Sequence, residues 1–375
     1  MEVWIRQGMA YHPHTDGPMP FPVPGWMWDP KLGEELYDDR IRYMRRVDEL
    51  GFDGLIFTEH HYGPNGGLTP SPLIMLSAAS QVTERIKLVT MGMALALYPH
   101  PVRVAEELAM VDNLSRGRLV VGFISSGAQS LYSYSVPVAE ERGRYHEAYD
   151  LVVKAWQDEN PFAWHGEYFD YECVSILPRP LQQPHPPTWT TAVSAESIQW
   201  AAEHHIAMLA SGTVEQSRDI LNYYQEFAES ECGWTPTPAQ RGIHREFFMA
   251  RTKAEAQERI DELMNRDSAD QYSRIFEAPV LQELERERYK VRSFAYASDG
   301  GRPARSGRSL DGLRGGSYLV GDPDSMAEQI LEQQKACGAN VLVIRPEIGR
   351  MTIDQVGDSL ELFAREVLPV LHRAT

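Results

Sequence analysis

The sequence has few cysteines, no long apolar run and a deficit of positive charge, and each shortage excludes a class of protein. Its three cysteines, Cys173, Cys232 and Cys337, are widely spaced and form no CxxC pair. A disulfide framework and a thiolate zinc site are therefore excluded. No apolar run approaches the roughly 18 residues that a membrane helix needs, and residues 1–6 lack the layout of a signal peptide. These absences predict a cytoplasmic protein with no membrane partner.

Acidic residues outnumber basic ones, with 53 Asp plus Glu against 36 Lys plus Arg and a net charge of −17. Nucleic acids and acidic membranes need a basic surface for their phosphates, so neither is expected as a partner. One small phosphorylated ligand stays possible, because a few local donors can hold a phosphate against an unfavourable overall field. The 375 residues, 43% of them hydrophobic, suffice for two or three ordinary domains or for one large barrel.

Short apolar runs rich in β-branched residues alternate with segments of helical spacing along the chain. Eight such runs are predicted to be strands, at residues 3–6, 54–57, 86–91, 119–124, 188–191, 206–210, 245–250 and 341–344. Eight strand–helix units predict an α/β fold, a (β/α)8 TIM barrel. A doubly wound open sheet is the alternative, which the absence of a GxGxxG after any strand disfavours.

Two segments interrupt this rhythm in what is otherwise predicted to be a single domain over residues 1–375. Segment 12–33 is rich in proline, and segment 267–316 ends in a run rich in glycine and arginine. A connection as long as the second is typical of an active-site lid. A tolerated surface insertion is the alternative.

Candidate catalytic groups follow the strands, as they do in barrel enzymes. Residues 58–62, with the sequence TEHHY, come directly after the second predicted strand. His60 and His61 point in opposite directions on an extended chain, so only one can face the cavity, where it suits acid–base chemistry. His12 and His14 resemble a metal-binding HxH pair, but the further ligands that a barrel hydrolase needs are missing, so no metal site is predicted.

A second candidate is the helix predicted to start after residues 188–191. Ser194 is its expected N-cap and Ser197 its third residue, so two hydroxyls and the free N–H groups of the first turn suit a phosphate. Arg142 and Arg144, before another predicted helix, would add positive charge. An ordinary serine N-cap is the alternative.

Motifs along nearly the whole chain resemble those of the bacterial luciferase-like flavin monooxygenases. They include FDGLIFTEHH at 52–61, TERIKL at 83–88, HPVRVAEE at 100–107, LSRGRL at 114–119 and GDP at 321–323, in the family's order. The resemblance implies a (β/α)8 barrel, in most members a dimer, that binds reduced FMN (FMNH2) at the barrel mouth and reacts it with O2. A separate NAD(P)H-dependent flavin reductase would supply FMNH2, and a small organic substrate would undergo hydroxylation or Baeyer–Villiger oxygenation.

The resemblance also assigns roles to residues. His60 is expected to be the catalytic histidine, and a non-proline cis peptide is expected around Gly92–Met93, under the flavin ring. Where close relatives carry an arginine after the fourth strand, this chain has serines at 125 and 126, so positive charge at the phosphate would come from Arg142 and Arg144. The residues expected at the cofactor are Gly92, Met93, Ser125, Arg142, Ser194, Ala195 and Ser197.

Other functions stay open. A deazaflavin-dependent dehydrogenase of the same superfamily would transfer a hydride without oxygen. A non-catalytic flavin-binding barrel, or the supporting subunit of a heterodimer, would have no need of His60.

Overall fold

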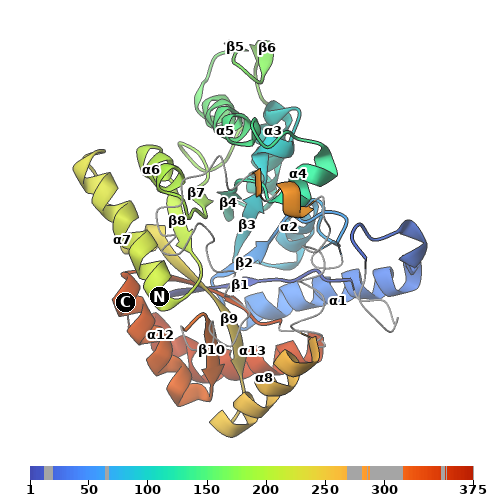
Figure 1. The fold of residues 1–375 in the computed structure, drawn as a ribbon, viewed down its shortest axis with the longest axis vertical. Helices are drawn as coiled ribbons and strands as arrows, with labels where there is room; N and C mark the ends of the chain where they lie inside the picture. Colours follow the sequence, from blue (N-terminus) through green and yellow to red (C-terminus); the bar gives the residue numbers. More distant parts are fainter. Residues whose placement is uncertain are drawn as a thin grey trace.

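Eight parallel strands form a closed barrel surrounded by helices (Figure 1), which confirms the predicted (β/α)8 fold. This computed structural model describes residues 1–11, 20–63, 67–267, 281–284, 286–287, 316–347, 351 and 353–374. The barrel strands, in their order around the ring, are β1 (Glu2–Arg6), β2 (Gly54–Phe57), β3 (Lys87–Met93), β4 (Leu119–Phe123), β7 (Thr188–Thr190), β8 (Ala207–Ala210), β9 (Arg241–Met249) and β11 (Val341–Arg345).

Strand β9 closes the ring, because it pairs with β8 on one side and with β11 on the other. It begins at Arg241, before the predicted start at residue 245. Its second half, from Glu246 to Met249, pairs with the additional strand β10 (Tyr318–Gly321), which the sequence did not predict.

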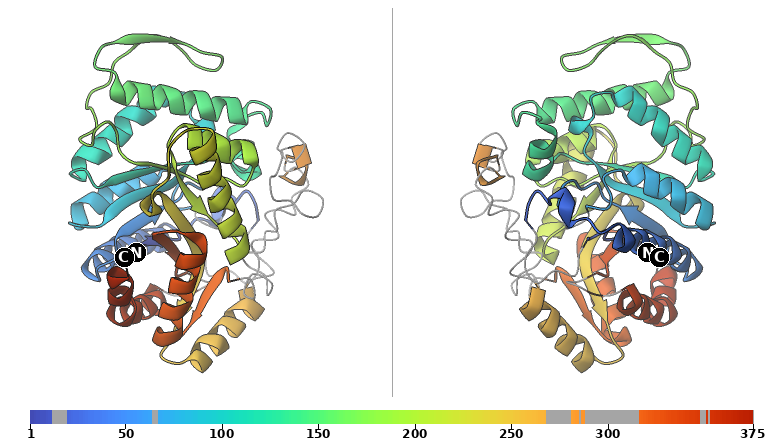
Figure 2. Two further views of the ribbon diagram at one scale, coloured as in Figure 1. Left: turned by 90° about the vertical axis from the view of Figure 1, so that its left-hand side faces the viewer. Right: turned by 90° about the vertical axis from the view of Figure 1, so that its right-hand side faces the viewer.

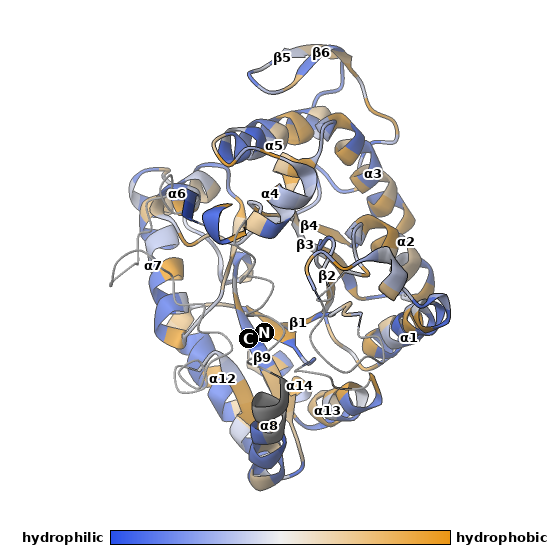
Figure 3. Cartoon of the chain, turned by 45° about the vertical axis from the view of Figure 1, so that its right-hand side comes forward, coloured by the Kyte–Doolittle hydropathy of each residue, from blue (hydrophilic) through white to orange (hydrophobic). Residues whose placement is uncertain are grey.

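Helices cover the outside of the barrel. They are α1 (Pro30–Glu49), α2 (Pro72–Val82), α3 (Pro101–Leu114), α4 (Ala128–Tyr134), α5 (Glu141–Gln157), α6 (Ala195–Glu203), α7 (Val214–Ser230), α8 (Lys253–Asp267), α12 (Pro323–Cys337), α13 (Ile353–Glu366) and α14 (Leu368–Arg373). The short 3-10 helices are η1 (Gly25–Met27), η2 (Leu95–Leu97) and η3 (Pro238–Gln240). Figure 3 shows hydrophilic residues along α7 and α12 together with apolar ones, the pattern of helices with one buried face.

Local signals fix several helix ends. Asp322 accepts a hydrogen bond from the Ser325 N–H at 3.0 Å and caps α12, as the sequence predicts. The same helix ends at Gly338, whose φ of 59° lies in the left-handed region that glycine adopts at little cost. Ser194 caps α6 by accepting from the Ser197 N–H at 3.3 Å.

The barrel interior is filled by apolar side chains that we call the plug. The plug consists of Trp4, Ile56, Val89, Met91, Val120, Trp189, Ala207, Leu209, Val341 and Val343, all buried. The rings of Trp4 and Trp189 meet edge to face, with centroids 5.0 Å apart. The interior of the barrel is thus a packed core, and chemistry is left to the ends of the strands.

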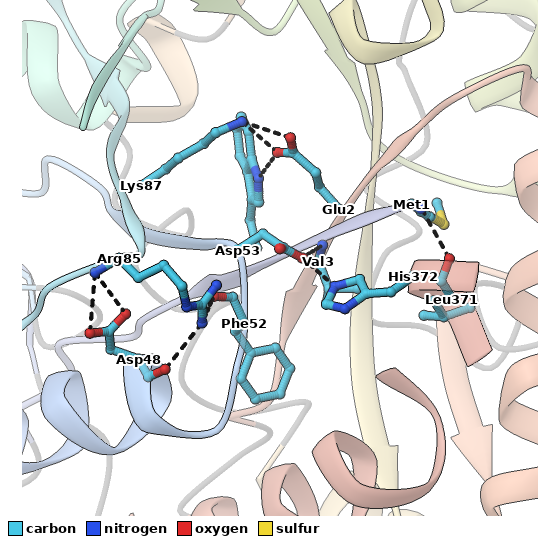
Figure 4. A network of polar contacts seen from close by, with 11 residues as sticks. Met1, Glu2, Val3, Asp48, Phe52, Asp53, Arg85, Lys87, Leu371 and His372 are labelled. Carbon is cyan, nitrogen blue, oxygen red and sulfur yellow. Dashed lines mark hydrogen bonds and ion pairs between the residues drawn. The ribbon is translucent and has the colours of Figure 1, made fainter. Parts of the chain in front are cut away.

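Polar contacts tie the amino-terminal ends of the first strands together (Figure 4). The Asp53 carboxylate, just before β2, accepts from the Val3 N–H at 2.8 Å and contacts His372 Nε2 of α14 at 2.9 Å. Lys87 at the start of β3 donates to both Glu2 carboxylate oxygens, at 2.7 and 2.8 Å. The starts of β1, β2 and β3 and helix α14 therefore hold one another in place.

An antiparallel hairpin, β5 (Phe162–His165) and β6 (Asp170–Val174), extends outward beyond α5 (Figure 1, Figure 2). Its turn is anchored by Glu147 of α5, whose carboxylate accepts from the N–H groups of residues 167, 168 and 169 at 2.9 to 3.0 Å. Sequence reasoning did not predict this hairpin.

Of the two expected insertions, segment 12–33 is described from residue 20 onward. Asp29 caps α1, so this helix already begins within that segment. Segment 267–316 lies outside the described residues except for 267, 281–284, 286–287 and 316, so the lid stays a prediction. Within the described part of the chain, no helix combines the length and the apolar character that crossing a membrane requires.

Candidate active site

Polar residues continue the inward-facing rows of the barrel at the carboxyl ends of the strands. Because successive residues of a strand alternate between its faces, Arg6 follows Trp4 of the plug. Beyond the end of β2 at Phe57, burial still alternates, with Glu59 and His61 buried and His60 half-buried. On the strands that follow β1 on its other side, Arg345 of β11 lies 3.4 Å from the Glu246 carboxylate of β9. The mouth above the plug is thus polar and carries a histidine and an ion pair.

The adjacent histidines differ in their surroundings. His61 is buried, and its Nε2 lies 2.8 Å from Oε1 of Glu59, which is buried as well. His60 is half-buried, and its backbone N–H donates to the Thr69 carbonyl at 3.2 Å. The carboxylate that follows β2 therefore binds His61, on the face opposite to His60. The sequence predicted a histidine beside a carboxylate but did not identify His61 as that histidine. Alternation along an extended chain already puts Glu59 and His61 on one face.

Glu59 also binds the segment that follows β3. Its Oε2 accepts from the Tyr98 hydroxyl at 2.9 Å and from the Ala94 N–H at 3.3 Å. Burial, together with the negative charge of Glu59, raises the pKa of Tyr98 far above its usual range. Tyr98 is therefore a neutral hydrogen-bond donor at any physiological pH.

The residues predicted after β3 lie close to their expected positions. The non-proline cis peptide joins Met91 to Gly92, one bond before the predicted Gly92–Met93. A Cβ at Gly92 would lie 2.5 Å from the Ile124 side chain and 3.0 Å from the Gly122 carbonyl, so only glycine fits there. Met93 is buried in the core between barrel and helices, so a contact with a cofactor would fall to its backbone rather than its side chain.

The structure brings Arg142 to the start of α6. The guanidinium of Arg142, on α5, forms an ion pair with Glu196 in the first turn of α6. Its Nη2 is buried and has no hydrogen-bond partner within the described chain. Ser194 Oγ donates to Ser197 Oγ at 2.8 Å beside it, with Ala195 between them as the first residue of the helix. Two hydroxyls, the free N–H groups of the helix start and an incompletely bonded guanidinium therefore lie together.

The other residues expected near a phosphate lie elsewhere or contribute less. Arg144 pairs with Glu140 on its own helix at 2.8 Å, and its guanidinium lies 5.5 Å from the ring centroid of Tyr168. These two contacts lie on α5 and in the hairpin turn, and a role of Arg144 at the start of α6 stays a prediction. Ser125 is half-buried in the loop between β4 and α4, and its neighbour Ser126 donates its N–H to Glu141 at 2.7 Å.

The contact between α5 and α6 is aromatic. The His146 ring stacks on Trp200 with centroids 4.3 Å apart and planes 2° from parallel. Burial, helped by the positive charge of Arg142, lowers the pKa of His146 to about 4. This neutral stack sets the spacing of the two helices that carry Arg142 and Ser194.

Metal-binding geometry is not found among the described residues, in which no three His, Cys, Asp or Glu side chains group closely enough to hold an ion. His12 and His14 lie outside the described residues.

Comparison with known sequences gives one consistent family. A family model described as luciferase-like monooxygenase matches residues 24–340. The chain is 34% identical over 191 residues to an uncharacterised protein of Sinorhizobium fredii, covering 50% of this chain and 55% of that protein. It is 30% identical over 180 residues to the oxygenase component of flavin-dependent trigonelline monooxygenase of Acinetobacter baylyi, covering 47% and 49%. It is 28% identical over 190 residues to the alkanal monooxygenase beta chain of Photorhabdus luminescens, covering 50% and 56%. The chain thus spans about half the length of the curated relatives it matches.

Solved structures share the fold over nearly the whole chain. A monooxygenase from Streptomyces bottropensis superposes with a TM-score of 0.78 at 23% identity, covering 99% of both chains. The oxygenating constituent of 3,6-diketocamphane monooxygenase from Pseudomonas putida, a type II Baeyer–Villiger enzyme in complex with FMN, gives 0.70 at 21%, covering 98% of both. An F420-dependent secondary alcohol dehydrogenase gives 0.68 at 15%, covering 99% of both. At identities below 25%, the likeness to these structures shows a shared fold and nothing more.

Proposed function

Because this chain belongs to the luciferase-like monooxygenase family, we propose that it is an oxygenase that uses FMNH2 and O2 to oxygenate a small organic substrate. The observation that carries the proposal is the start of α6, where Ser194, Ser197 and Arg142 lie together. The Arg142 guanidinium, with one nitrogen lacking a partner among the described residues, lies at the N-terminus of α6. Together they offer the hydrogen-bond donors that a phosphate needs, although the chain as a whole is acidic.

These residues fit the phosphate of FMN. Ser194 and Ser197 would bind it with their hydroxyls, the first turn of α6 with its N–H groups, and Arg142 with its charge. Reduced flavin, when bound, supplies the electrons that activate O2. The chain's own part is to orient the flavin over the plug, to place His60 at the mouth as a hydrogen-bond donor or proton carrier, and to keep water out. Gly92 lets β3 pack closely against Ile124 and the Gly122 carbonyl, where a Cβ would clash.

Glu196 makes the phosphate site testable. Its carboxylate forms an ion pair with the Arg142 guanidinium, to which a phosphate would bind in the proposed site. We expect Arg142→Gln to weaken FMN binding by about tenfold to a hundredfold, the value of a charge-assisted hydrogen bond. Riboflavin, which has no phosphate, should bind both proteins alike. Glu196→Gln is the matched variant, and it should tighten FMN binding because it releases Arg142. Equal losses for FMN and riboflavin would contradict the phosphate assignment.

The reaction is tested by anaerobic titration with FMNH2, FMN and the deazaflavin, followed by mixing with O2. We expect FMNH2 to bind most tightly and to be consumed together with O2. Preferred binding of the deazaflavin would favour the alternative of a dehydrogenase, whose fold this chain shares.

His60→Ala should abolish product formation while leaving FMN affinity within about threefold, because His60 lies away from the phosphate. An active His60→Ala variant would remove this residue from the mechanism.

The proposed partners are a second copy of this chain and a flavin reductase. Exposed apolar side chains lie on neighbouring helices, with Ile74 on α2 70% exposed and Met110 and Leu114 on α3 50% and 47% exposed. An apolar patch of this kind supports a homodimer. A relative described as an oxygenase component supports a separate NAD(P)H-dependent reductase. All three cysteines are free, in keeping with the expected cytoplasmic location.

A further inference from the structure

We infer that Glu59 is a positioning residue whose buried carboxylate holds the segments after β2, β3 and β4 in one arrangement around His60. The inference rests on the proposed function, because it explains how the mouth of the barrel keeps its shape for that reaction.

The first support is the number of partners that one carboxylate binds. Glu59 Oε1 contacts His61 Nε2 at 2.8 Å, while Oε2 accepts from the Tyr98 hydroxyl at 2.9 Å and the Ala94 N–H at 3.3 Å. The side chains of Glu59 and His61 are each only 3% exposed. A buried carboxylate is costly unless hydrogen bonds satisfy it, so these three contacts are what keep Glu59 in place.

The second support is the continuation of this network to α4. His61 Nδ1 lies 3.3 Å from the Tyr134 hydroxyl, and the rings meet edge to face at 4.6 Å. Gln129 of the same helix donates to the His61 carbonyl at 2.8 Å. Since the Glu59 carboxylate only accepts, the network assigns the proton to Nε2 and leaves Nδ1 to accept from Tyr134. Helix α4 is therefore tied to residue 61 near both of its ends.

The third support is the position of His60 within this network. Its neighbours on both sides, Glu59 and His61, are locked together, and its own N–H donates to the Thr69 carbonyl at 3.2 Å. The backbone at residue 60 therefore has little freedom, so the Glu59 carboxylate helps to fix the direction in which the His60 side chain leaves the chain. A displacement of about 1 Å at such a group can cost a hundredfold in rate.

The substitution Glu59→Gln tests this role because the side chain keeps its shape but loses acceptors. One oxygen of the amide can still accept from His61, but its NH2 group then faces the Ala94 N–H and the Tyr98 hydroxyl. We expect amide hydrogen exchange to become about tenfold faster at residues 94–98 and 128–134. We expect kcat to fall at least about tenfold while the FMN dissociation constant changes less than about threefold, because the phosphate residues are elsewhere.

The matched control is Glu147→Gln, since Glu147 also accepts several backbone N–H groups but holds the outer hairpin. It should speed exchange only at residues 166–169 and leave kcat unchanged. Tyr98→Phe removes a single donor without changing the shape of the site. It should show a smaller effect in the same two segments, and it carries the test should Glu59→Gln not fold.

Exchange at the parent rate in both segments of a folded Glu59→Gln or Tyr98→Phe variant would overturn the inference, whatever happens to kcat. A kcat unchanged in Glu59→Gln would overturn it as well. A parent protein that consumes no O2 with FMNH2 would instead defeat the proposed function. The exchange measurement needs neither cofactor nor substrate, so the two failures are distinguishable.

Discussion

Gly54 and Trp4 meet inside the barrel at a distance that admits no side chain at residue 54. A Cβ there would lie 2.5 Å from Cγ of the Trp4 ring, which is itself confined by Trp189. We therefore expect Gly54→Ala to lower the free energy of unfolding by about 1–3 kcal/mol, the usual cost of overpacking a core. Urea unfolding followed by tryptophan fluorescence measures it. In α13, Gly357 has open space around it, so Gly357→Ala should stabilise by about 0.5–1 kcal/mol. Similar effects of the two substitutions would contradict the packing argument.

Single residues were predictable where their partners are near in sequence. The Ser194 cap depends on Ser197, three positions away, and propensity rules describe such local bonds. Glu59 binds Ala94, Tyr98 and, through His61, Tyr134, at separations of 35 residues or more. Such contacts arise because the barrel brings the ends of different strands together, and no local pattern contains that information.

Among the elements, α5 and α6 provide a stability that depends on pH. His146 stacks on Trp200, and burial lowers the pKa of His146 to about 4, whereas an unfolded histidine titrates near about 6.5. Between these values the unfolded chain binds more protons than the folded chain. The contribution of His146 is therefore complete above pH 6.5 and is lost as the pH falls toward 4.

We expect His146→Phe, which keeps the stack but cannot titrate, to weaken this dependence. Between pH 7 and pH 5, the free energy of unfolding should fall by about 1 kcal/mol less in the variant than in the parent, after allowance for solvent screening. Urea unfolding at both pH values measures the difference. His165→Gln on the exposed hairpin is the control, because the hydrogen bond with Asp170 raises the pKa of His165, a shift of the opposite sign that cannot reproduce this effect. If the free energy of unfolding falls equally in the parent and in His146→Phe between pH 7 and pH 5, His146 does not cause the pH dependence.

Strand prediction succeeded for the barrel because parallel strands buried on both faces are apolar nearly throughout, as in β4. The hairpin strand β5 has an exposed position at every second residue, and its Phe162 and Trp164 are only partly buried against the core. Strand β10 has four residues and directly follows the long segment 267–316, so nothing local distinguishes it. Its place is set by pairing with the second half of β9.

At the scale of the whole molecule, the apolar side chains of α2 and α3 predict the oligomeric state. If two copies of the chain pack through these helices, a charge in their midst will separate them. We expect the parent protein to have about twice the monomer mass of 42.5 kDa in light scattering, and Ile74→Glu with Met110→Glu to reduce it to the monomer mass. Trp26→Glu replaces another exposed side chain, on η1, and should leave the mass unchanged. A parent protein of monomer mass would refute the dimer.

The plug also has a consequence for the order in which flavin and substrate would bind. Its ten apolar side chains fill the barrel interior, so in the proposed reaction the flavin and the organic substrate would both enter from the carboxyl ends of the strands. If a flavin binds next to the plug, an organic substrate bound after it would block its way out, so the flavin would bind first and leave last. For the proposed reaction we therefore expect compulsory-order kinetics, in which excess substrate competes with incoming flavin.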